Sequence, residues 1–182
     1  MAAKKKNLSE YNAKGVASAK SMHFGIVVSE WNAEITESLF KACHDTLIAH
    51  GANPENIIKK YVPGSFELPL GAQFFAGHSN VDAIICIGCV IQGETRHFEF
   101  ISTAVAEGIM NVNLKYNLPV IFCVLTPDNP KQAKERAGGK YGNKGVEAAI
   151  AAIKMVFLKK DIIETMSVIR LILIRKLLFL KI

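Results

Sequence analysis

Short apolar runs alternate along the chain with longer segments in which apolar residues recur every three or four positions. The short runs predict four strands, over His23–Val28, Asn56–Val62, Val81–Ile91 and Pro119–Leu125. The longer segments predict five helices, over residues 32–51, Glu67–Gly77, Phe98–Tyr116, Lys131–Ala137 and Val146–Leu158. Asn32 stands where the first of these helices begins, and we expect its side chain to cap that helix.

The alternation of strands and helices predicts an α/β fold, because parallel strands need crossovers that cover both faces of their sheet. Right-handed crossovers leave few topologies, and we expect a three-layer, flavodoxin-like sandwich with a four-stranded parallel sheet of order 2-1-3-4. Residues 1–20 are polar and lack periodicity, which predicts a flexible arm. One domain is expected over residues 21–160, followed by an atypical, disordered tail over residues 161–182.

The side chains suited to chemistry follow the carboxyl ends of the predicted strands, the edge at which open parallel sheets bind ligands. Trp31 follows the first strand, Ser65-Phe66-Glu67 the second, and Gln92–His97 the third. The last segment leads directly into a helix, whose first N–H groups and dipole attract anions. His97 is the side chain best suited to move protons near neutral pH. The sequence therefore predicts a phosphate-handling site with a histidine acid or base.

A nucleoside triphosphate site is a poor alternative. Gly88–Thr95 nearly spells a P-loop, but Glu94 occupies the position where that motif places its lysine. A carboxylate there opposes the phosphate charge that the lysine offsets. A second alternative stays open at this point, in which Gly93 and Thr95 only shape and cap a helix and His97 is a surface residue.

Charge and cysteine content exclude several other classes. The two ends, residues 1–20 and 161–182, hold nine of the 22 basic residues and three of the 16 acidic ones, so the intervening segment is formally neutral. Nucleic-acid binding is therefore disfavoured. Cys86 and Cys89 have CxxC spacing, but an odd separation along a strand sends their side chains to opposite faces, so no shared metal is expected. The four cysteines and the lack of an apolar signal segment near Lys4-Lys5-Lys6 indicate a reducing cytoplasm.

Four separated motifs, in one order and with matching spacing, resemble the lumazine synthase family over about residues 21–160. They are Gly25–Val28 with Trp31-Asn32, Val62–Pro69, Gly88–Phe98, and Glu135–Gly138 with Gly142–Gly145. The resemblance implies condensation of 5-amino-6-(D-ribitylamino)uracil with 3,4-dihydroxy-2-butanone 4-phosphate. The products would be 6,7-dimethyl-8-ribityllumazine, phosphate and water, in the penultimate step of riboflavin biosynthesis. This transferase reaction needs no metal and no redox cofactor.

The resemblance also implies roles for individual residues. His97 matches the proton-transfer residue of the family. The residues that match the ribitylaminouracil site are Trp31, Ser65, Phe66, Glu67, Cys89, Val90, Ile91, Phe122 and Lys144. Those that match the phosphate site are Glu94, Thr95 and Arg136. Of these, Phe122, Arg136 and Lys144 match positions that a neighbouring subunit supplies in the family. Without the resemblance, a core role for Trp31 and Phe122 and a solvated Arg136 remain open.

The family forms homo-oligomers, with pentamers as the unit. The short Gly138–Gly145 linker favours closure of twelve pentamers into a 60-subunit icosahedral shell, for which riboflavin synthase is a candidate partner. The chain departs from the family at Gln92, where many members carry a basic residue, and beyond Lys160. Charges interrupt the apolar runs of that tail, so we predict neither a membrane span nor a membrane anchor there.

Two other functions stay open. The same pocket could serve a non-catalytic shell that binds flavin or lumazine, although storage alone does not require His97, Arg136 and Thr95. A flavodoxin-like electron carrier is the second, but here the phosphate loop follows the third strand instead of the first.

Overall fold

The computed structural model describes residues 7–179 and contains the predicted α/β sandwich. Four parallel strands form one sheet in the order β2-β1-β3-β4, which confirms the predicted topology. The strands are β1 (Phe24–Ser29), β2 (Ile57–Val62), β3 (Ala83–Cys89) and β4 (Val120–Leu125). The helices are α1 (Ala33–Ala49), α2 (Leu68–His78), α3 (His97–Tyr116), α4 (Pro130–Arg136) and α5 (Lys144–Phe179). Short 3-10 turns lie at Ala13–Gly15 (η1), Pro54–Asn56 (η2) and Ser65–Glu67 (η3).

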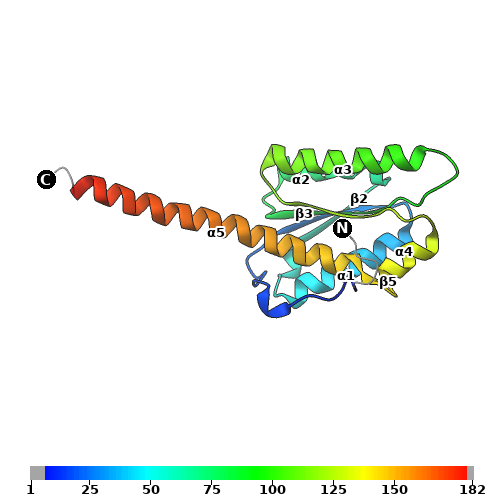
Figure 1. The fold of residues 1–182 in the computed structure, drawn as a ribbon, viewed down its shortest axis with the longest axis horizontal. Helices are drawn as coiled ribbons and strands as arrows, with labels where there is room; N and C mark the ends of the chain where they lie inside the picture. Colours follow the sequence, from blue (N-terminus) through cyan, green and yellow to red (C-terminus); the bar gives the residue numbers. More distant parts are fainter. Residues whose placement is uncertain (1–6, 180–182) are drawn as a thin grey trace.

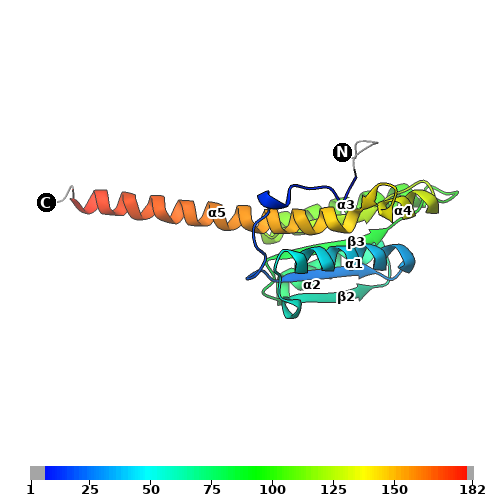
Figure 2. The same cartoon turned by 90° about the horizontal axis from the view of Figure 1, so that it is seen from below.

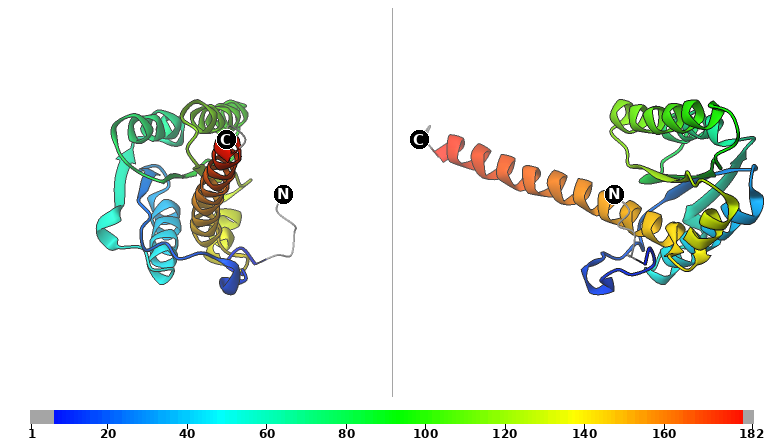
Figure 3. Two further views of the ribbon diagram at one scale, coloured as in Figure 1. Left: turned by 90° about the vertical axis from the view of Figure 1, so that its left-hand side faces the viewer. Right: turned by 45° about the vertical axis from the view of Figure 1, so that its right-hand side comes forward.

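The sheet separates two helical layers, with α2 and α3 on one face and α1, α4 and α5 on the other (Figures 1 and 3). Each face has its own apolar core. Val27, Ile84 and Cys86 pack with α2 and α3, whereas Ile26, Ile85 and Cys89 pack with α1 and α5. β3 is buried along its whole length, which agrees with the continuous apolar run in its sequence. Cys86 and Cys89 lie on opposite faces, as strand alternation predicts.

A short antiparallel hairpin that the sequence pattern did not predict joins the last two helices. It consists of β5 (Ala137–Gly139) and β6 (Gly142–Asn143), with Gly138 and Gly142 at positive φ. Strands of two or three residues are too short to produce a period in the sequence. The hairpin leads directly into α5, so it determines where that helix begins.

The segment before β1 is packed where the structure describes it, which differs from the flexible arm that we expected. Leu8 N donates to Tyr141 O at 2.7 Å, and Asn143 N donates to Ser9 Oγ at 2.9 Å. Ala19 is fully buried, and the Tyr11 hydroxyl lies 3.0 Å from His50 Nε2. Backbone groups and single side chains hold this segment through hydrogen bonds, which hydrophobic periodicity does not register. Residues 1–6 lie outside the described part of the chain.

The last helix is also longer than expected. α5 continues from Lys144 to Phe179 and projects well beyond the sheet (Figures 1 and 2). We expected this helix to end at Leu158 and the tail from residue 161 to be disordered. The sequence between Val146 and Phe179 contains neither glycine nor proline, so nothing in it stops a helix. The part beyond Lys160 adds about 28 Å of helix, and residues 180–182 lie outside the described part.

Within residues 7–179, none of the helices combines the length and apolar character that a membrane crossing requires.

The close approach between α1 and α5 depends on Gly145. A Cβ at this position would clash with the backbone carbonyl of Leu39. Backbone cannot move aside as the end of a flexible side chain can, so α5 would have to shift away from α1.

We therefore expect Gly145→Ala to lower the free energy of unfolding by about 2–3 kcal/mol. Gly93→Ala is the matched control, because no heavy atom lies within 4 Å of a Cβ built at Gly93. Chemical denaturation of both variants and the wild type measures the difference. Equal stability of the two variants would contradict the close packing at Gly145.

Candidate active site

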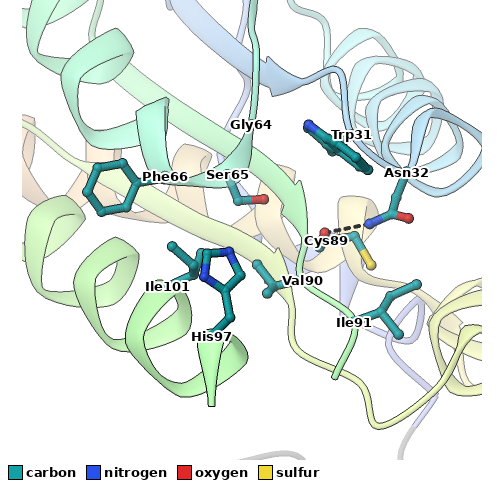
Figure 4. Close-up of a pocket in the computed structure, with 10 residues that line it drawn as sticks. All are labelled: Trp31, Asn32, Gly64, Ser65, Phe66, Cys89, Val90, Ile91, His97 and Ile101. Atoms are coloured by element: carbon teal, nitrogen blue, oxygen red, sulfur yellow. Dashed lines mark hydrogen bonds between the residues drawn. The ribbon is translucent and has the colours of Figure 1, made fainter. Parts of the chain in front are cut away.

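A pocket of about 450 Å³ opens at the carboxyl edge of the sheet, where β1, β2 and β3 end. Three loops and the start of α3 surround it (Figure 4). It is lined by Trp31, Asn32, Gly64, Ser65, Phe66, Cys89, Val90, Ile91, His97 and Ile101. Seven of the predicted site residues therefore share one cavity, namely Trp31, Ser65, Phe66, Cys89, Val90, Ile91 and His97.

The pocket lies where two neighbouring strands send the chain to opposite faces of the sheet. β1 and β3 are adjacent in the sheet, and their last paired residues are Val28 and Ile87. After β1 the chain enters α1 on one face, and after β3 it enters α3 on the other. The two connections diverge, so a crevice forms between the strand ends, which is where such sheets bind ligands.

Two aromatic side chains stand at different sides of the pocket (Figure 4). Trp31 is 72% exposed and Phe66 is 57% exposed. Large exposed apolar surfaces next to a cavity mark places where a ligand or another chain binds. The indole ring is suited to stack on a flat, aromatic ligand.

The Ser65–Glu67 turn packs closely against β3. Gly64 N donates to Glu67 Oε2 at 2.9 Å, which closes the turn before α2. Ser65 is buried, and its hydroxyl would lie 2.7 Å from a Cβ at Gly88. Glycine at position 88 therefore allows the turn to approach the strand. Glu67 is not among the residues that line the pocket, since its carboxylate folds back onto the turn.

His97 is the first residue of α3 and is exposed at the edge of the pocket, beside Ile101 (Figure 4). Its backbone N–H donates to Thr95 Oγ1 at 3.4 Å. Thr95 and Glu94 lie in the exposed loop before the helix and do not line the pocket. Arg96 pairs with the carboxylate of Glu99 at 3.3 Å. The loop thus places a hydroxyl and a helix N-terminus next to the imidazole.

The backbone after β3 presents polar groups to the pocket. Val90 N donates to Leu125 O at 2.8 Å, and Gln92 N donates to Pro127 O at 3.0 Å. Because successive N–H groups of an extended chain point in opposite directions, the N–H of Ile91 points away from β4, toward the pocket. The carbonyl of Cys89 faces the same side, where Asn32 Nδ2 donates to it at 2.8 Å.

The structure does not bring Phe122, Arg136 and Lys144 into this pocket. Phe122 is on the edge strand β4 and is 36% exposed. Arg136 ends α4, where its Nη1 donates to Gln132 O at 3.0 Å and its guanidinium lies 5.1 Å from the ring centre of Tyr141. Lys144 begins α5 and pairs with Glu147. The pocket of a single chain is therefore without these three side chains.

Asn32, Gly64 and Ile101 line the pocket but were not among the predicted site residues. Asn32 occupies the expected N-cap position of α1, yet its side chain makes no capping hydrogen bond. Its backbone is left-handed, with φ 59° and ψ 45°, which directs the side amide to the Cys89 carbonyl. Asparagine tolerates this conformation better than most other non-glycine residues. An asparagine directly after Trp31 was therefore the one sequence feature that could have pointed to this conformation.

Cys89 is the one cysteine among the residues that line the pocket, and it is nearly buried. Burial raises its pKa to about 11, because the pocket wall disfavours the thiolate. The other three cysteines are fully buried, and burial raises their pKa values as well. All four are free thiols. Within residues 7–179, no group of three or more His, Cys, Asp and Glu side chains is arranged to hold a metal ion.

A model of the 6,7-dimethyl-8-ribityllumazine synthase family matches residues 21–160. Curated proteins with this name are similar to the chain over most of its length. The one from Cytophaga hutchinsonii is 58% identical over 156 residues, which cover 86% of this chain and 98% of the relative. The one from Christiangramia forsetii is 52% identical over 162 residues, which cover 88% and 96%. The one from Parabacteroides distasonis is 51% identical over 156 residues, which cover 86% and 98%.

We expect iodoacetamide to modify Cys89 before the other cysteines, because none of the others lines the pocket. The rate should rise about tenfold per pH unit between about pH 7 and pH 10, since the thiolate fraction grows tenfold per unit below the pKa. Peptide mass mapping of the folded protein at short labelling times measures both effects, with Cys89→Ala as the control. A rate independent of pH, or first labelling at another cysteine, would contradict this environment.

Proposed function

Because the chain belongs to the 6,7-dimethyl-8-ribityllumazine synthase family, we propose that the pocket between Trp31 and His97 is the place where this reaction occurs. The enzyme is a transferase of riboflavin biosynthesis. It condenses 5-amino-6-(D-ribitylamino)uracil with 3,4-dihydroxy-2-butanone 4-phosphate to 6,7-dimethyl-8-ribityllumazine, phosphate and water. The observation that carries the assignment of the site is the meeting of Trp31, the Ser65-Phe66 turn, the end of β3 and His97 in one cavity.

The pyrimidine substrate fits the side of the pocket that lies between Trp31 and β3. The indole can stack on the flat ring, while the N–H of Ile91 can donate to the polar edge of the uracil. Ser65 and Phe66 then border the ribityl chain. Glu67 contributes through the turn that it closes, since its carboxylate accepts from Gly64 N.

The phosphate of the second substrate fits the start of α3. The hydroxyl of Thr95 can donate to a phosphate oxygen, and the dipole of α3 favours negative charge at its first turn. Glu94 in the same loop is exposed, so its carboxylate can stay in solvent away from the phosphate.

His97 is placed to move protons during the reaction. The substrate amine first attacks the ketone and forms an imine with loss of water. Neutral His97 can then take a proton from the hydroxyl-bearing carbon next to the imine as phosphate leaves the following carbon, and return a proton as the resulting enol tautomerises to a ketone. The ribityl-bearing amine then attacks this ketone, and loss of a second water closes the ring. The exposed position of its ring at the pocket edge allows this contact with either substrate.

We further propose that the active site is completed by a neighbouring subunit of a homo-oligomer. Phe122, Arg136 and Lys144 lie outside the pocket of their own chain, at positions where an adjacent copy could use them. Exposed apolar side chains support such an assembly, namely Phe66, Leu70, Phe74, Phe100, Met110 and Leu114. A pentamer is the proposed unit, and twelve pentamers in a shell are its proposed higher form, in which riboflavin synthase is a candidate partner.

Lumazine formation from the two purified substrates, followed by absorbance and fluorescence, tests the proposed function. We expect activity in the wild type and a rate lowered by up to about 10²-fold in His97→Ala, because general acid–base catalysis is lost. Arg136→Ala should mainly raise the KM for the butanone phosphate, since a bidentate phosphate contact is lost. A folded, inactive wild type that binds flavin tightly would instead favour a storage shell.

Mixing these two impaired variants, assayed at a butanone phosphate concentration below the KM of Arg136→Ala, tests whether sites are shared. His97→Ala removes a residue of the pocket, whereas Arg136→Ala removes one that we assign to the neighbouring subunit. Mixed oligomers should contain some sites with both residues intact, and activity should exceed that of either variant alone. Light scattering should give five or sixty times the 19.9 kDa of one chain. A monomeric mass, or mixtures no more active than their components, would refute the shared site.

A further inference from the structure

We propose that Asn32 is a positioning residue, whose side chain ties the loop that carries Trp31 to the strand end that binds the pyrimidine. This inference rests on the proposed function, because it assigns Asn32 to the same pocket. The observation behind it is one hydrogen bond across the crevice, in which Asn32 Nδ2 donates to the carbonyl of Cys89 at 2.8 Å (Figure 4).

The bond extends the sheet beyond its last backbone pair. β1 and β3 are paired up to Val28 and Ile87, and the chain after β1 then leaves toward α1. Val90 N already pairs with Leu125 O on β4, so the carbonyl of Cys89 faces the side that β1 has left. An unpaired carbonyl in a partly buried position is unfavourable. The side-chain amide of Asn32 donates the hydrogen bond that a backbone N–H of β1 would have supplied if the strand had continued.

The backbone of Asn32 is adapted to this contact and not to capping. Asn32 and Asn117 are the only non-glycine residues with positive φ within the described part of the chain. In a conventional N-cap the side-chain oxygen accepts from the first turn of the helix, and Asn32 makes no such bond. Uncommon backbone conformations that persist next to a binding site are candidates for a role in that site.

Within its own chain, Trp31 has little besides this contact to hold it in place. Its side chain is 72% exposed, so packing restrains the indole only weakly. The residue that follows it is anchored to β3 through the side amide of Asn32. The same bond orients the Cys89 carbonyl, which precedes the Val90-Ile91 backbone on the other side of the pocket. One amide therefore sets the spacing between the stacking ring and the strand edge.

Asn32→Asp and Asn32→Gly separate this role from a general effect on folding. Aspartate keeps the shape and tolerates positive φ, but its carboxylate cannot donate to Cys89 O. Glycine accepts the backbone conformation and removes the side chain. Asn117→Asp and Asn117→Gly are matched controls, since Asn117 has φ 48° at the end of α3 and does not line the pocket.

Two readouts are informative, and the first needs no activity. Trp31 is the sole tryptophan of the chain, so time-resolved fluorescence anisotropy reports on its ring alone. We expect faster motion of Trp31 in both Asn32 variants and unchanged motion in the Asn117 variants. The carboxyl group that Asn32→Asp introduces is ionised at neutral pH and regains an O–H donor when it is protonated in acid. Asn32→Asp should therefore recover the wild-type anisotropy as the pH falls, whereas Asn32→Gly should not.

The second readout is the dependence of rate on each substrate. Loss of one hydrogen bond should raise the KM for the ribitylaminouracil about five- to tenfold, with kcat and the KM for the butanone phosphate within about twofold of wild type. Unchanged Trp31 anisotropy in both Asn32 variants would overturn the positioning role. An inactive wild type would overturn the proposed function instead, and the anisotropy comparison would still decide the role of Asn32.

Discussion

The divergence of β1 and β3 is the constraint on which the rest of the site depends. Two adjacent parallel strands can share a ladder only while they run side by side, and their helical connections leave for opposite faces of the sheet. The polar backbone groups at the strand ends then have no strand partner, and the space between the connections is open. Three parts of the pocket meet in that space. Trp31 follows β1, Cys89 ends β3, and His97 begins the helix after β3.

The pocket is open, and Arg136 and Lys144 lie outside it in their own chain; these two features have a common explanation. Two largely exposed aromatic residues, Trp31 and Phe66, line the pocket of the single chain. Arg136 and Lys144 meanwhile satisfy their charges or donor groups locally, through Gln132 O, the ring of Tyr141 and the carboxylate of Glu147. The shared site that we propose accounts for both features, since association would cover apolar surface and add positive charge at the same time.

The two ends of the chain show where sequence patterns are weak. Hydrophobic periodicity identified the body of the sheet and its helices, and it missed the packing of residues 7–20, which uses single hydrogen bonds to the β5–β6 hairpin and to the end of α1. For α5 the loss of family resemblance beyond Lys160 led us to expect a disordered tail, whereas the uninterrupted helix propensity of the segment accounts for the observed helix. Hydrophobic periodicity indicates which face of a helix is buried. A helix that projects from the fold has no face buried against the sheet, so its periodicity carries little information.

The sequence by itself determined the strand order, the two-sided core and the residues that follow each strand, because burial and crossover handedness leave few alternatives for these. It also predicted that His97, Trp31 and the Ser65-Phe66 turn lie close together, and they line one pocket, since parallel strands bring their carboxyl ends together. Only the tertiary structure decided that Asn32 reaches the Cys89 carbonyl and that Glu67 closes its own turn. These depend on side-chain directions and on contacts between residues far apart in the chain, and no local pattern of residue types encodes either.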